Sequence, residues 1–128
     1  MPRTGRVVSL TGYNHIIARG NGGICIFEDD EDRYRMLTLF EDKLVGNGVG
    51  VTAWCLMSNH FHLMVDDPYE KISSCMSGVL TSYAMYFNRK TDRVGHLFQD
   101  RFTNIPVEND AVSYTHLRAH ETKANLVC

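Results

Sequence analysis

Two histidines separated by one residue have the clearest capacity for chemistry in this sequence. His60 and His62 lie in a run rich in Phe, Leu, Met and Val, which is typical of a buried β-strand. Because side chains alternate between the faces of a strand, both imidazoles project from one face while Phe61 points to the other. Two imidazoles held in this way can ligate one divalent cation. The triplet alone does not define a metal site, since most such triplets are ordinary polar strand positions.

Arginine and amide side chains at the ends of the expected elements form a second group. Arg19 and Asn21 stand at the start of a glycine-rich turn, Arg89 ends an amphipathic segment, and Arg101 precedes the last expected strand. Such side chains, with the N–H groups of a turn, are common donors to the phosphates of nucleic acids. The sequence therefore predicts DNA contacts at these four residues, although any single arginine could equally be a solubilising surface charge.

Tyrosine hydroxyls can attack a phosphodiester, but no tyrosine in this chain has neighbours that indicate activation. Tyr83 falls on the apolar stripe of an expected helix, which favours a place in the core. Tyr86 lies at the edge of that stripe, where packing with a solvated hydroxyl is ordinary. Tyr114 lies in residues 112–128, a stretch without helical or strand periodicity.

Composition restricts the class of protein. The chain has 128 residues, of which 44% are hydrophobic and 22% charged, as in a single globular domain. No stretch approaches the roughly 18 apolar residues of a membrane helix, so we expect no membrane partner. The four cysteines are far apart, which favours reduced thiols and a cytoplasmic location. The net charge of −2 means that a nucleic acid would have to bind a local basic patch.

Hydrophobic periodicity predicts the order β-α-β-β-α-β. The expected strands are residues 13–19, 49–57, 60–65 and 102–107. The first helix should begin at the acidic run 28–32, which we interpret as a capped, solvated helix start rather than a metal site. Its apolar positions Tyr34, Leu37, Phe40 and Leu44 recur at about helical spacing, and the second helix carries one apolar stripe of Ile72, Met76, Val79, Leu80, Tyr83, Ala84 and Phe87. The order predicts a ferredoxin-like α+β domain, an antiparallel sheet with both helices on one face.

Several segments, taken in order, resemble the single-tyrosine HUH transposases, in particular the REP-associated tyrosine transposase branch. The longest is Ala-Trp-Cys-Leu-Met-Ser-Asn-His-Phe-His-Leu at residues 53–63. The others are residues 2–3, 13–15, 19–21, 26–27, 83–89 and 95–102. Two departures are Ser58, where the family usually has proline, and Asp100, where it often has glycine. The ordered set covers nearly all of residues 1–110 and is highly specific.

The resemblance implies a ferredoxin-like fold, with Mg²⁺ or Mn²⁺ bound by His60 and His62. It implies a partner, single-stranded or hairpin DNA, and a reaction in which a tyrosine becomes linked to the 5′ phosphate and frees a 3′ hydroxyl. Relatives act as monomers or homodimers, so a homodimer is a further expectation.

The segment that carries the nucleophile in this family has no counterpart here. In the family it is a Tyr-Ile-x-x-Asn-Pro-like helix after the last strand. Residues 112–122 and 126–128 instead resemble a translated transposon-end sequencing adapter. We therefore expect residues 1–111 to form a transposase domain without its C-terminal catalytic helix, residues 112–128 to be a non-native tail, and the chain to be a truncated, inactive fragment.

Two other functions remain open on the sequence. One is a non-catalytic nucleic-acid-binding module on the ferredoxin-like sheet, in which His60 and His62 only line a groove. The other is a small domain with structural histidines and a protein partner. Metal binding separates the transposase from both alternatives. Binding to structured single-stranded DNA separates the domain with a protein partner from the transposase and from the nucleic-acid-binding module.

Overall fold

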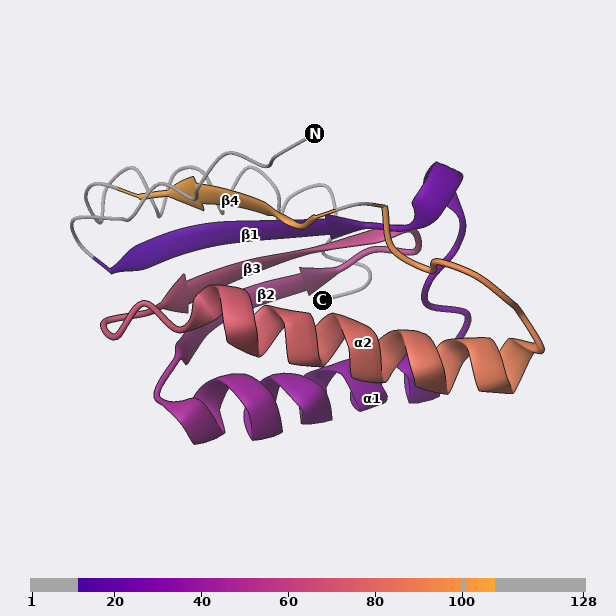
Figure 1. Ribbon diagram of the computed structural model, residues 1–128, viewed down its shortest axis with the longest axis horizontal. Coiled ribbons are helices and arrows are strands. Elements are labelled where there is room, and N and C mark those ends of the chain that lie inside the picture. The colour runs from indigo at the N-terminus through magenta and orange to yellow at the C-terminus, as the bar shows by residue number, and fades with distance from the viewer. Residues whose placement is uncertain (1–11, 100, 108–128) are drawn as a thin grey trace.

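A four-stranded antiparallel sheet is covered on one face by two helices (Figure 1). The computed structural model describes residues 12–99 and 101–107. The strands, β1 (Tyr13–Arg19), β2 (Gly50–Leu56), β3 (His60–Asp66) and β4 (Thr103–Pro106), lie in the order β2-β3-β1-β4. The helices are α1 (Asp30–Leu39) and α2 (Ile72–Thr91). The predicted ferredoxin-like α+β fold is confirmed, whereas Tyr114 and the predicted tail 112–128 lie outside the described residues.

The central pair of strands, β1 and β3, separates two environments. Ile16 and Ala18 of β1, with Phe61, Leu63 and Val65 of β3, point to the helices and are buried in the apolar core. The alternate residues of both strands point away from the helices and include both predicted metal ligands. The sheet thus places its polar chemistry on the face opposite the packed core.

Helix α1 begins at a side-chain cap, where Asp29 accepts a hydrogen bond from the N–H of Asp32. Tyr34, one of the apolar positions of the predicted helix, does not lie on its buried face, since it is 69% exposed. Asp32 and Met36 are buried instead, because the cap and the contacts of Asp32 with α2 set the rotation of the helix. A π-helical turn η2 (Phe40–Leu44) and a 3₁₀ turn η3 (Val45–Asn47) continue α1 to Gly48, whose φ of +87° ends it.

Helix α2 follows its predicted stripe. Its buried residues are Ile72, Met76, Val79, Tyr83 and Phe87, while Leu80 and Ala84 of the predicted stripe are only partly buried. The helix ends at Asp92, which adopts a left-handed conformation while its N–H donates to the carbonyl of Asn88. No helix within residues 12–99 and 101–107 has the length and apolar character needed to cross a membrane.

The turn between β2 and β3 is held against the chain that follows β1. Ser58 accepts hydrogen bonds at its carbonyl from the N–H groups of Ile26 and Phe27, at 2.7 and 3.2 Å. The N–H of Gly20 donates to the carbonyl of Asn59 at 2.8 Å, and a Cβ at Gly20 would collide with the carbonyl oxygen of Ile24. These contacts fix the start of β3 beside the end of β1.

Strand β2 is irregular in its middle. Its pairing with β3 shifts register between Val51 and Ala53, a β-bulge. The hydroxyl of Thr52, the residue between them, donates to the carbonyl of Met64 at 3.1 Å. Beyond the bulge, Cys55 lies opposite His62.

Candidate metal and DNA site on the sheet

The predicted histidine pair lies where β3 begins, on the face of the sheet away from the helices. His60 and His62 are two residues apart on β3, and their ring centres are 5.0 Å apart. Arg19 pairs with His60 and Ile17 with His62 in the β1–β3 register. The structure therefore brings one predicted DNA-binding arginine next to the predicted metal ligands.

His60 is half-buried and has a defined orientation. Its Nδ1 lies 2.7 Å from Oδ1 of Asn59. Because an amide oxygen only accepts hydrogen bonds, Nδ1 is the donor and carries the ring proton. The atom of this imidazole that would ligate a metal is therefore Nε2.

His62 is only 3% exposed and contacts a third histidine, His15, which is fully buried. Nε2 of His15 lies 3.0 Å from Nδ1 of His62, and the ring centres are 5.1 Å apart. His15 is not among the site residues that the sequence predicts. The spacing of His15 and Arg19 within one strand places both on one face of the sheet. Only the pairing of β1 with β3 shows that His15 lies close to His62.

The types of the two side chains and the distance between their rings are compatible with a shared divalent cation. Two imidazoles that share an ion through metal–nitrogen bonds of roughly 2 Å have their ring centres about 5 Å apart, as His60 and His62 do. Within the part of the chain that the structure describes, no three or more His, Cys, Asp or Glu side chains are grouped to hold a metal. His60 and His62 would thus supply two ligands, with water or substrate oxygens completing the shell.

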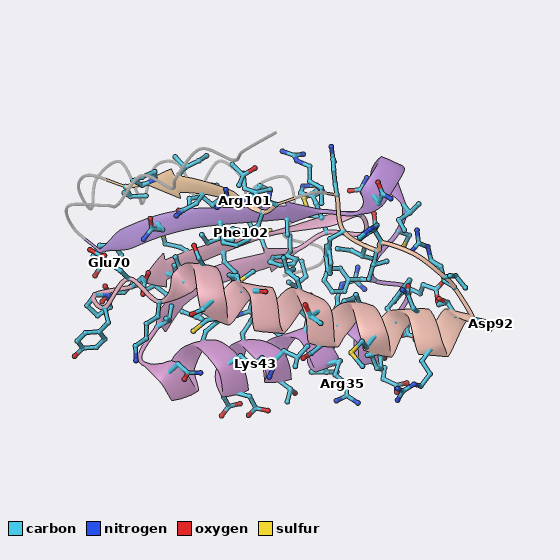
Figure 2. All side chains as sticks on the ribbon, in the orientation of Figure 1. Arg35, Lys43, Glu70, Asp92, Arg101 and Phe102 are labelled. Carbon is cyan, nitrogen blue, oxygen red and sulfur yellow. The ribbon has the colours of Figure 1, made fainter. Side chains whose placement is uncertain are left out.

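The other predicted DNA-binding residues divide between two layers of the molecule. The segment around residue 98 runs beside the end of β1, since Gly20 bridges Phe98 and the N–H of Gln99 donates to the carbonyl of Arg19. Arg101 follows on this segment at the sheet, whereas Arg35 and Lys43, which are not among the predicted DNA-binding residues, lie on the helix layer (Figure 2).

Asn21 is exposed on the turn η1 (Asn21–Gly23), beside the same segment. Its backbone N–H donates to the carbonyl of Leu97 and its Nδ2 to the carbonyl of His96. Arg89 is exposed in the last turn of α2, on the helix layer. Arg19, Asn21 and Arg101 are therefore gathered around the end of β1, and Arg89 is not part of that group.

No tyrosine of the described residues adjoins His60. Tyr83 is fully buried on the helix side, its hydroxyl donates to the carbonyl of Ile26, and burial raises its pKa. Tyr86 is also on α2 and donates to Asp32. Desolvation and this hydrogen bond raise the pKa of Tyr86 to about 12. Tyr13 lies opposite Asp66, six residues or about 20 Å along β3 from His60.

A charged cluster on the helix side joins α1 to α2. Asp32 is fully buried and accepts hydrogen bonds from Tyr86 at 2.7 Å, from Lys90 at 2.8 Å and from the N–H of Glu28 at 2.9 Å. Lys90 also pairs with Asp29 at 2.9 Å. The expected capped helix start is therefore correct in its cap, but one of its carboxylates is buried rather than solvated.

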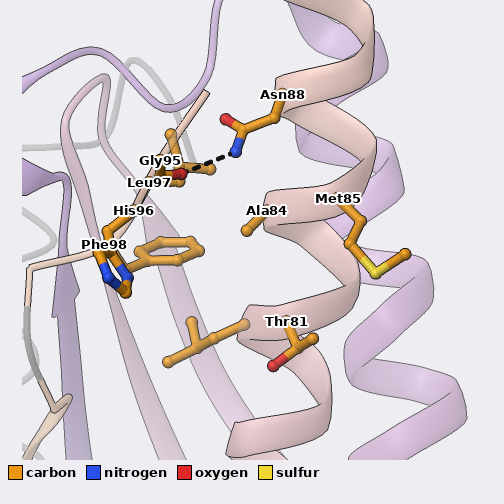
Figure 3. A pocket seen from close by; sticks show the side chains of 9 residues that line it. Thr81, Ala84, Met85, Asn88, Gly95, His96, Leu97 and Phe98 are labelled. Atoms are coloured by element: carbon orange, nitrogen blue, oxygen red, sulfur yellow. Dashed lines mark hydrogen bonds between the residues drawn. The ribbon is translucent and has the colours of Figure 1, made fainter. Parts of the chain in front are cut away.

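A pocket of about 370 Å³ opens between the C-terminal half of α2 and residues 95–98 (Figure 3). Its walls include Met85 and Asn88 of α2 and the rings of His96 and Phe98. Nδ2 of Asn88 donates to the carbonyl of Gly95, which joins the two walls. The pocket is on the helix side of the sheet and is separate from the histidine pair.

The fold and the site together define a ferredoxin-like domain that presents a His-x-His pair and basic side chains from its sheet. The chain belongs to the family of IS200-like transposases, whose model matches residues 9–117. That match extends into the segment from residue 112 onward, and the boundary expected at residue 111 stays a prediction.

Two solved structures share the fold. One is a REP-associated tyrosine transposase bound to a REP hairpin, which is 15% identical with a TM-score of 0.65, over 91% of this chain and 68% of that one. The other is a protein from Deinococcus radiodurans R1, described as a transposase, which is 15% identical with a TM-score of 0.62, over 96% of this chain and 98% of that one. A search of curated proteins finds no match.

Proposed function

We propose that this chain is the metal-binding and DNA-binding part of a transposase that nicks and rejoins single-stranded, hairpin-bearing DNA through a 5′-phosphotyrosine intermediate. The observation that carries the proposal is the placement of His60 and His62 on one face of the sheet, with Arg19 in register beside His60. Membership of the IS200-like transposase family supports the reaction class. The hairpin bound by the structural neighbour supports the substrate class.

Each side chain has a distinct role in this proposal. His60 and His62 hold Mg²⁺ or Mn²⁺ through their Nε2 atoms. When bound, the ion polarises the scissile phosphate and stabilises negative charge on its oxygens. Arg19 and Arg101 neutralise neighbouring phosphates, and Asn21 adds an amide donor from the turn that follows β1. Arg89, on the helix layer, would contact a more distant part of the DNA.

The basic group around the end of β1 gives a test of DNA binding. Replacing Arg19 and Arg101 together with alanine is expected to weaken binding to a DNA hairpin with a single-stranded flank by about 10-fold. Two lost phosphate contacts should reduce the slope of log Kd against log salt concentration by about 1 to 2. Fluorescence anisotropy over a salt series measures both quantities.

The matched control removes the same charge from the helix layer. Arg35 and Lys43 lie there (Figure 2), and their double alanine variant is expected to retain both the affinity and the salt slope. If the Arg19 and Arg101 variant also retains both, these residues are ordinary surface charges and the proposed DNA surface is wrong.

None of the five tyrosines of the described residues is placed to serve as the nucleophile in this proposal. Tyr34, Tyr83 and Tyr86 are on the helix layer, Tyr13 is distant along the strands, and Tyr69 follows the end of β3 opposite to His60. We propose that residues 1–111 are a transposase domain whose catalytic helix is replaced by the non-native segment 112–128. The purified chain should then form no covalent adduct with hairpin DNA in Mg²⁺ or Mn²⁺. Denaturing electrophoresis of labelled DNA measures this.

Two variants identify the source of an adduct if one forms. An adduct that is lost in Tyr114→Phe would show that the tail supplies the nucleophile and would overturn the proposed truncation. An adduct lost in Tyr86→Phe would place the reaction on the helix side and contradict the proposed histidine site.

A second function, a non-catalytic nucleic-acid-binding module, is favoured by the same absence of a described tyrosine near His60. It differs from the first in needing no metal. Titration with Mn²⁺ separates the two: the transposase requires binding that depends on His60 and His62, and the module requires DNA binding that is independent of the ion.

A further inference from the structure

We infer that His15 is a positioning residue that holds the His62 ring as its Nδ1–H tautomer, with Nε2 directed to the metal. The inference rests on the proposed function for the identity of the site. Its geometric basis is the 3.0 Å contact between Nε2 of His15 and Nδ1 of His62. Both residues belong to the buried polar residues of the sheet, since His15 is fully buried and His62 is 3% exposed.

The rings of the two proposed ligands are supported in the same way once His15 is included. Nδ1 of His60 donates to the Asn59 side chain, which leaves Nε2 as its ligand atom. Nδ1 of His62 has the equivalent contact with His15. Metal-ligating histidines commonly donate their second ring N–H to a neighbouring acceptor, which fixes both tautomer and ring orientation. For His15 to accept, its own proton must lie on Nδ1.

The strand register shows why His15 supports the site rather than joining its ligands. In the register of β1 and β3, Arg19 lies opposite His60, Ile17 opposite His62, and His15 opposite Met64. An ion shared by His60 and His62 lies between those two rings. His15 is on the far side of His62, at a level roughly 13 Å along the strands from His60.

Burial makes the contact consequential. A buried imidazole without a hydrogen bond is costly, so each ring of this pair satisfies a polar atom of the other. An apolar side chain at position 15 would fit the buried environment but would remove the acceptor that selects the His62 tautomer. The ring of His62 could then carry its proton on Nε2 and lose its ability to ligate.

The test compares two substitutions in the full chain. His15→Phe keeps a buried ring and removes the acceptor, whereas His15→Gln places an amide near the position of Nε2. Met64→Leu is the control, because Met64 pairs with His15, faces the same way and is 2% exposed. Long-range ¹H–¹⁵N spectra of histidine-labelled protein without metal report the tautomer of each ring.

We expect His62 to be the Nδ1–H tautomer in the unsubstituted chain, in His15→Gln and in Met64→Leu, and a mixture in His15→Phe. Mn²⁺ affinity, measured by electron paramagnetic resonance, should fall about 10- to 100-fold in His15→Phe and remain close to that of the unsubstituted chain in the other two variants. A His62 ring with its proton on Nε2 in the unsubstituted chain would overturn the inference, even if His15→Phe does not fold.

Two further outcomes are decisive. If Mn²⁺ perturbs the nitrogens of His15 as strongly as those of His60 and His62, His15 is a ligand and the inference is wrong. If the unsubstituted chain binds no Mn²⁺, the proposal of a metal site is wrong. The tautomer measured without metal still decides whether His15 orients His62.

Discussion

Replacing His60 and His62 with alanine is expected to remove Mn²⁺ binding from this chain. Each single substitution deletes one of the two proposed ligands and should weaken binding by roughly 100-fold or more, beyond the 10- to 100-fold typical of losing a supporting residue. The double variant should show no saturable binding. Isothermal titration calorimetry measures the affinities, and in a relative that carries the nucleophilic tyrosine the same substitutions should abolish DNA nicking.

The control for this experiment is Thr103→Ala. Thr103 is exposed on β4 and pairs with Ile17, so it faces the same way as the histidines without contributing an imidazole. Circular dichroism shows whether each variant keeps its fold. We expect each to keep it, because the apolar core is on the other side of the sheet. Undiminished Mn²⁺ binding by the double variant would contradict the proposed metal site.

The second large effect is on stability and concerns Asp32. Its carboxylate is fully buried and accepts from Tyr86, Lys90 and the N–H of Glu28. Asp32→Ala leaves those donors without their acceptor and should lower the free energy of unfolding by about 3 kcal/mol. Urea unfolding followed by the fluorescence of Trp54, the single tryptophan, measures it.

Asp30 provides the matched control, since it is also in the first turn of α1 but is exposed. Asp30→Ala should change the free energy of unfolding by about 0.5 kcal/mol or less. Equal effects of the two substitutions would show that Asp32 acts only through the helix dipole and not through its contacts with α2.

Asp32 also predicts how stability depends on pH. Burial raises the pKa of its carboxyl, but the hydrogen bonds from Lys90, Tyr86 and the N–H of Glu28 outweigh burial, so the pKa lies below its ordinary value of 3.8. A lowered pKa in the folded state means that stability is fully present above the ordinary pKa and is lost as pH falls through the folded value. Below about pH 4, the unsubstituted chain should lose stability more steeply than Asp32→Asn.

The sequence alone predicts the architecture, because the apolar patterns of the strands and of α2 agree with the burial of their side chains. The predicted strand 13–19 coincides with β1, and the stripe from Ile72 to Phe87 is the buried face of α2. The rotation of α1 was not predictable in this way. Its pattern included Tyr34, but the helix is oriented by a polar residue, Asp32, whose partners are more than fifty residues away.

The site could be predicted only in part for a similar reason. The spacing of His60 and His62 within one strand determines their shared face, because alternation is a local property. The contact of His15 with His62 depends on the β1–β3 register, which joins residues 47 positions apart. Arg89 has the same residue type and local setting as the arginines at the sheet, so only the tertiary structure separates it from them.

The bulge in β2 has a consequence for how copies of this chain can meet. Among the described strands, β2 and β4 are the outer ones. A bulge bends and twists an outer strand, and a proline in such a strand lacks the N–H that a new neighbour would need. The irregular pairing between Val51 and Ala53, and Pro106 at the end of the four-residue β4, therefore discourage edge-to-edge growth of the sheet. Within the part of the chain that the structure describes, neither outer strand therefore favours a sheet continued from one copy into the next.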